Sequence, residues 1–153
     1  MKRVMLPLLV SLGVLAVAPV AQANDASLEH ALKPYKARLT SDIGYLSSFS
    51  APSRRAASGA LSTLSKVRSD LNAATQAANS HQASTSSGRK GRTEVLSAFH
   101  DATLAAGDAR ASANAARAGH SSTARRDAGE EQTEINKAIP LFEKGGGLLG
   151  LTT

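Results

Sequence analysis

The sequence predicts an all-α fold, a small antiparallel bundle of four helices with up-down-up-down topology. Apolar residues make up 42% of the 153 residues but aromatic residues only 3%, and alanine, the strongest helix former, supplies much of the apolar content. Apolar positions recur at steps of three and four in four successive segments, as on one face of a helix. No segment shows the alternation typical of a strand. Because large aliphatic residues are sparse, partial disorder is the second interpretation.

The first expected helix contains a proline. Pro34 lies inside the apolar stripe and is expected to kink the helix or to mark its first turn. The segment ends at residues 50–52, where Ser50 is predicted to cap the second helix and Pro52 to lie in its first turn. The stripe consists of Leu28, Leu32, Tyr35, Leu39, Ile43, Leu46 and Phe49.

The second and third helices carry complementary faces. The second begins with leucines and ends with alanines, whereas the third begins with large residues around Phe99 and continues with alanines to a stop at Gly119. Antiparallel packing of the two would place large side chains against small ones. The fourth helix is expected from about Ser122, with a kink at Pro140.

Residues 79–92 are predicted to form a flexible linker between the second and third helices. Their sequence, NSHQASTSSGRKGR, is rich in serine and glycine and has no apolar periodicity. Arg89, Lys90 and Arg92 are interpreted as a solvated run of charge, with a specific basic binding loop as the alternative. Thr93 is the expected N-cap of the third helix.

Residues 145–153, GGGLLGLTT, are predicted to form a C-terminal tail. The three glycines are expected to stop the fourth helix. The leucines that follow are too few to anchor the chain in a membrane. We expect them to cover the open end of the bundle, with a protruding interaction tail as the alternative.

Residues 1–23 have the three-part pattern of a secretory signal peptide. A basic start is followed by an apolar core and by a small-x-small cleavage site that ends at Ala23. The core is interrupted by two prolines and a glycine and falls short of the ~20 residues of a spanning helix, which argues against a permanent anchor. Cleavage after Ala23 would leave a single bundle domain, residues 24–144, and the tail. The mature protein is expected in the periplasm, in the cell envelope or outside the cell.

The expected mature chain has no cysteine, hence no disulfides, and carries sixteen basic and twelve acidic side chains, a net charge of +4. This mild charge argues against specific binding of nucleic acid. The four histidines are scattered without a metal-binding spacing, and no nucleophile motif frames a serine. We therefore expect no catalytic residue, metal or cofactor. The predicted function is a non-enzymatic exported protein that acts through surface contacts. Metal-dependent turnover, or turnover sensitive to a serine reagent, would instead indicate an enzyme.

Arginine residues are expected to gather at one end of the bundle. If the helices alternate in direction, the first and third corners lie at the same end. Arginine suits phosphate and carboxylate oxygens, so this cluster is the candidate site for anionic polymers or lipid headgroups. The alternative is that three acidic residues, Asp127, Glu130 and Glu131, neutralise it and leave a solvated surface. The five candidate residues are Arg54, Arg55, Arg117, Arg125 and Arg126.

Overall fold

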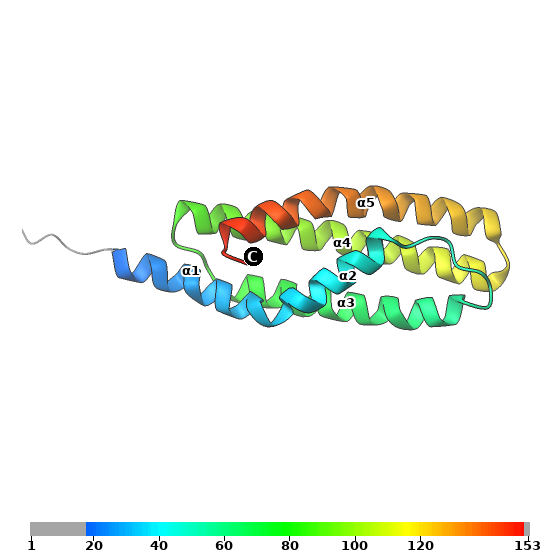
Figure 1. Ribbon diagram of the computed structural model, residues 1–153, viewed down its shortest axis with the longest axis horizontal. Helices are drawn as coiled ribbons and strands as arrows, with labels where there is room; N and C mark the ends of the chain where they lie inside the picture. The colour runs from blue at the N-terminus through cyan, green and yellow to red at the C-terminus, as the bar shows by residue number, and fades with distance from the viewer. Residues whose placement is uncertain (1–17, 152–153) are drawn as a thin grey trace, which may run out of the picture.

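The structure, a computed structural model, describes residues 18–151 and folds them into helices without any strand in that range, which confirms the predicted all-α class (Figure 1). The predicted signal peptide, residues 1–23, lies mostly outside the described residues. The elements are α1 (Ala18–Leu32), the 3₁₀ turn η1 (Lys33–Tyr35), α2 (Lys36–Ser47), α3 (Ala57–Ser80), α4 (Ser86–Ala118) and α5 (Ser121–Leu148).

The first arm of the bundle consists of α1, η1 and α2 in succession. Pro34 lies in η1, where its missing N–H breaks the regular helix. The interruption predicted at Pro34 is therefore confirmed. Pro140 lies inside α5, which continues past it, and the kink expected there stays a prediction. The predicted cap at Ser50 is wrong, because α3 begins only at Ala57 after a turn in which the hydroxyl of Ser53 accepts from the backbone N–H of Ala56.

Helices α4 and α5 contact each other more extensively than any other pair and lie side by side along the molecule (Figure 1). Two contacts show that they are antiparallel. The Ser112 hydroxyl donates to the carbonyl of Ala124, 2.7 Å away, at one end, and the ammonium of Lys144 lies 2.6 Å from the carboxylate of Glu94 toward the other. This pair is the longest continuous packing surface of the described chain.

Two glycines permit the close approach of α4 and α5. A Cβ on Gly91 would lie 2.9 Å from the Cβ of Leu148, and a Cβ on Gly145 would lie 2.8 Å from the backbone N of Val95. Only glycine avoids both overlaps. The small residues therefore hold the C-terminal part of α5 against the first half of α4.

The predicted helix stop at residues 145–147 is wrong. Helix α5 continues through these glycines to Leu148. Just beyond it, Gly150 has φ +69°, and hydrogen bonds run from Leu151 N to Gly146 O and from Gly150 N to Gly147 O. Glycine lowers helix propensity by about 1 kcal/mol per residue. Close packing of the helices and burial of Leu149, which is 5% exposed, offset this effect.

The expected linker also becomes largely helical, because α4 begins at Ser86 rather than after Thr93. Its N-cap residue, Thr85, is held in place by a contact with α1. The Asp25 carboxylate on α1 accepts hydrogen bonds from the Ser84 N–H, 2.8 Å away, and from the Thr85 hydroxyl, and the latter lowers the pKa of Asp25. Thr85 Oγ1 in turn accepts from Gly88 N. With this contact from about sixty positions earlier in the chain, the helix begins eight positions before the expected start.

Arg92 is not the solvated charge that the sequence predicts. Its Nε lies 2.9 Å from the carbonyl of Ala78 and 3.0 Å from that of His81, at the C-terminal end of α3. A cation at this position satisfies helix carbonyls that have no partner within the helix. Together with a contact between Arg110 and Ser65 near the other end, it shows that α3 and α4 run antiparallel.

The core is narrow and contains many alanines. Its largest fully buried side chains come from every helix of the bundle, and the ring of Phe99 packs at 5.5 Å between centroids against the half-buried ring of Phe142. A second, smaller cluster of Ala57, Ala116 and Ala124 joins the start of α3, the end of α4 and the start of α5. The small side chains bring three helix termini together at one end of the molecule.

The substitution Gly145→Ala is expected to destabilise the protein by about 1–3 kcal/mol, because the new methyl would meet a backbone atom of α4. The matched control is Gly129→Ala, in the same helix, where a Cβ meets nothing within 4 Å. This control is expected to raise the melting temperature, since alanine favours helix by up to about 1 kcal/mol. Thermal unfolding followed by circular dichroism measures both, and shifts of the same sign would contradict the close-approach argument.

Candidate functional site: an arginine-lined cleft

A cleft of about 410 Å³ lies where the α2–α3 loop meets the α4–α5 turn. Both connections are at the same end of the molecule in Figure 1. Two arginines, Arg54 from the loop and Arg125 from α5, contribute to its lining, and no acidic side chain does. The other lining residues are small or neutral: Ala51, Pro52, Ser53, Ala116, Gly119, Ser121 and Ala124.

A tight turn between α4 and α5 shapes one wall of this cleft. Gly119 adopts φ +88°, which permits hydrogen bonds from its own N–H to the carbonyl of Ala116 and from the His120 N–H to that of Ala115. Helix α5 begins immediately afterwards, at Ser121. The predicted stop of the third helix at Gly119 is thus confirmed, and the turn directs the first residues of α5 toward the cleft.

The electrostatic character of the cleft is positive. Neither α3 nor α5 has an acidic residue in its first turn, and the N-cap residue of each, Ala56 and His120, makes no side-chain capping bond. The partial positive charge at a helix N-terminus adds to the field of nearby cations. Arg54 and Arg125 are both exposed, so their guanidinium groups are accessible to a ligand in solvent.

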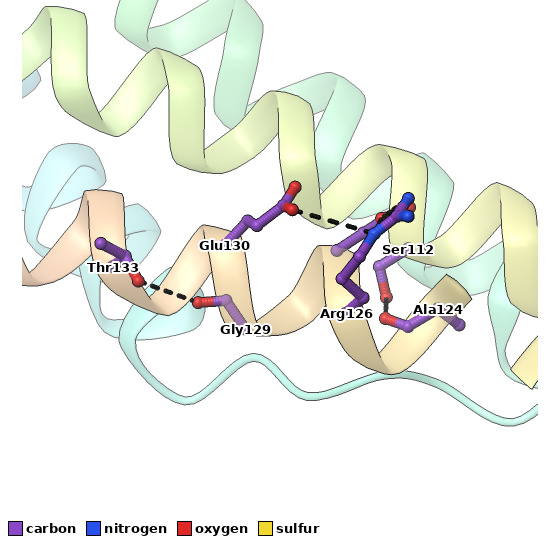
Figure 2. Close-up of polar contacts among 7 residues, drawn as sticks. Ser112, Ala124, Arg126, Gly129, Glu130 and Thr133 are labelled. Carbon is purple, nitrogen blue, oxygen red and sulfur yellow. Dashed lines mark hydrogen bonds and ion pairs between the residues drawn. The ribbon is translucent and has the colours of Figure 1, made fainter. Parts of the chain in front are cut away.

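The structure separates the five predicted arginines into different environments. Arg54 and Arg125 line the cleft, whereas the exposed Arg55 and Arg117 do not. Arg126 is turned toward acidic neighbours on its own helix. Its Nη2 lies 2.9 Å from Asp127 Oδ1. Its Nε lies 3.8 Å from Glu130 Oε1, as Figure 2 shows. Neutralisation by acidic residues therefore applies to Arg126 and not to the two arginines of the cleft.

Glu131 does not lie on the solvated surface to which the alternative interpretation of the arginine cluster assigns it. It is 0% exposed and points into the core. Its position follows from helical periodicity, because Ala128 and Ile135, three residues before and four after it, lie on the same buried face of α5. The spacing of the apolar residues in the sequence therefore predicts that position 131 is buried. The acidic residues next to it suggest an exposed surface instead.

The carboxyl group of Glu131 is only half satisfied. Its Oε2 accepts from Gln132 Nε2, 2.9 Å away, while Oε1 is buried without a hydrogen-bond partner among the described residues. The same nitrogen of Gln132 lies 3.2 Å from the carbonyl of Leu46 and 3.3 Å from that of Phe49. An amide NH₂ has two hydrogens for these three acceptors. The Glu131 carboxylate therefore competes with the backbone carbonyls of Leu46 and Phe49 for the two hydrogens of the Gln132 amide.

Burial is the main cause that raises the pKa of Glu131, to about 7. The hydrogen bond from Gln132 opposes the shift, and the nearby carboxylate of Asp108 adds to it. Burial likewise raises the pKa of Tyr45, with a further contribution from the charge of Glu131. The interior around α2, α4 and α5 thus disfavours negative charge.

Within residues 18–151, no three histidine, cysteine or acidic side chains are placed to hold a metal ion. No helix in the same range is long and apolar enough to cross a membrane.

The stability of the protein is expected to fall as the pH rises from about 4.5 to about 7. The folded-state pKa of Glu131 lies above its ordinary value of 4.5, so the folded state holds this proton more tightly than the unfolded state, and the resulting stabilisation is lost as the carboxyl group ionises. Glu131→Gln should remove most of this dependence and stabilise the protein at pH 8 by up to about 3 kcal/mol.

Chemical denaturation at several pH values tests this expectation. Glu130→Gln, at the exposed neighbouring position, is the matched control and should leave the pH dependence unchanged. If the curve of Glu131→Gln runs parallel to that of the parent protein, the buried carboxyl does not control the stability.

Comparison with known protein families, with curated proteins and with solved structures finds no match to this chain. The role of the cleft is therefore inferred from its own chemistry. A concave surface with two accessible guanidinium groups and no acidic lining residue is suited to bind an anion.

Proposed function

We propose that this chain is an exported, non-enzymatic helical protein that acts at the cell envelope or outside the cell, and that the arginine-lined cleft is its contact surface for anionic groups. One observation carries the proposal: Arg54 and Arg125, from separate elements, line a single cleft without an acidic residue in its lining. The expected ligands are the phosphate or carboxylate groups of an envelope polymer or of lipid headgroups.

The chemistry of arginine favours this class of ligand. A guanidinium group is planar and always charged, and it donates paired hydrogen bonds to phosphate or carboxylate oxygens. Arg54 and Arg125 have no ion pair with any described side chain, so neither needs to release a partner before binding. Since both are exposed, salt should screen the interaction strongly. Repeated anionic groups on a polymer or a vesicle would compensate for weak single contacts.

The double variant Arg54→Ser/Arg125→Ser is expected to bind heparin at least about tenfold more weakly than the parent at low salt, with a shallower dependence on salt. The double variant Arg55→Ser/Arg117→Ser is the matched control, because it removes the same charge from exposed positions outside the cleft lining. Affinity measured over a salt series distinguishes the two. Equal losses would assign binding to net charge and reject the cleft.

Vesicles containing phosphatidylglycerol provide the second probe for the same variants. Binding to these vesicles but not to heparin would assign the cleft to lipid headgroups, and the reverse would assign it to a polymer. Binding to neither by the parent protein would reject the proposed function.

The proposal includes export through the signal peptide and an up-down-up-down arrangement of the mature helices. Cleavage after Ala23 would leave Asp25 as the second residue, so the contacts of its carboxylate with Ser84 and Thr85 would be retained. The antiparallel contacts of α4 with α3 and with α5 support the alternating order.

Mass spectrometry of the protein recovered from the periplasm or the medium is expected to give an N-terminus at Asn24. The intact mass of the exported chain then corresponds to 130 residues. Recovery of only the full chain, or its retention in the cytoplasm, would contradict export by this segment.

A further inference from the structure

A second pocket lies between the first arm and the α4–α5 pair, away from the arginine-lined cleft. Its volume is about 270 Å³. Its lining comes from α1, α2, α4, α5 and the last described residue, and it is mainly aliphatic and aromatic. The apolar side chains are Leu32, Leu39, Val95, Phe99, Phe142 and Leu151.

The course of the backbone explains this pocket. The 3₁₀ turn at residues 33–35 separates α1 from α2, and both sides of this turn contribute to the lining. On the opposite side, Gly146 lines the pocket without a side chain to fill it. Protein interiors are otherwise packed with few voids larger than a water molecule. An apolar hollow of this size therefore offers dispersion contacts that an apolar ligand would complete.

Charge at the pocket comes from two residues. Lys36, at the start of α2, is half-buried and forms no ion pair with any side chain of residues 25–151. Glu143 is exposed and remains accessible to water. Of the two, the partly desolvated ammonium gains more from a counter-ion in the pocket. The hydroxyl of Thr40 is already used, since it donates to the backbone carbonyl of Lys36.

We propose that this pocket binds a single aliphatic chain that ends in a carboxylate, with the chain against the apolar wall and the carboxylate beside Lys36. The volume of about 270 Å³ accommodates about nine groups of the size of a water molecule or a methylene, each roughly 30 Å³. The proposal is independent of the arginine-lined cleft, because the two sites share no lining residue.

Calorimetric titration of the purified protein at pH 8 with saturated carboxylates from hexanoate to dodecanoate, each below its micelle concentration, tests this assignment. Binding is expected at one site per chain. Affinity should rise by up to about fourfold for each added methylene and then level near decanoate, where the pocket is full. An affinity that is absent for decanoate, or that shows no saturation at one site, overturns the proposal.

Charge variants test the assignment of Lys36. Lys36→Gln should weaken decanoate binding about three- to tenfold and leave decanol binding unchanged. Lys33→Gln, an exposed lysine of the adjacent turn that does not line the pocket, is the matched control and should change neither. Decyltrimethylammonium, with the same chain and the opposite charge, should bind the parent protein more weakly than decanoate. Equal effects of the two lysine variants, or preference for the cation, would overturn the assignment.

A blocking variant tests the location of the chain. Thr40 is exposed and lines the pocket, so Thr40→Trp places a ring there with little effect on the core. It should abolish binding of both decanoate and decanol while the arginine-lined cleft keeps its affinity for heparin. Unchanged decanoate binding by a normally folded Thr40→Trp would overturn the proposal. If this variant melts early, the comparison of the two lysine variants decides instead.

Discussion

The close contact between α4 and α5 is the constraint on which the rest of the structure depends. Gly91 and Gly145 allow the two backbones to approach until an added methyl on either side would overlap its neighbour. The helices are thereby aligned along most of their length, with the turn at Gly119 at one end and the capped end of α5 at the other. The arginine-lined cleft is built around that turn, and the apolar pocket has α4 and α5 as one of its sides.

Small side chains bring helices together but bury little apolar surface per residue. Polar contacts between remote segments complete the fold at its connections. Asp25 binds the residues just before α4, Arg92 binds carbonyls at the end of α3, and Gln132 binds carbonyls at the end of α2. Bonds of this kind, when one partner is charged, stabilise by about 1.5–3 kcal/mol. Glu131 is the exception, because its buried carboxyl has too few donors and opposes the fold once it ionises.

Part of the candidate site follows from the sequence. If successive helices alternate in direction, the two corners that carry arginines lie at the same end of the molecule. Arg54 and Arg125 do line one cleft there. Sequence spacing does not reveal that Arg126 turns back to Asp127, because adjacent side chains on a helix usually diverge. No local sequence pattern predicts the apolar pocket either, because its lining residues come from segments more than a hundred residues apart.

The sequence by itself determined the helical class, the break at Pro34, the end of α4 at Gly119 and the apolar faces, because these depend on periodicity and on backbone conformations that single residues impose. Only the tertiary structure decided the helical state of residues 86–92 and 145–148. Both segments are rich in glycine or serine, so local propensity favours a loop. The N-cap residue of the first, Thr85, is held by Asp25, about sixty positions earlier, and the second is held by contact with α4. These distant interactions outweigh the local preference.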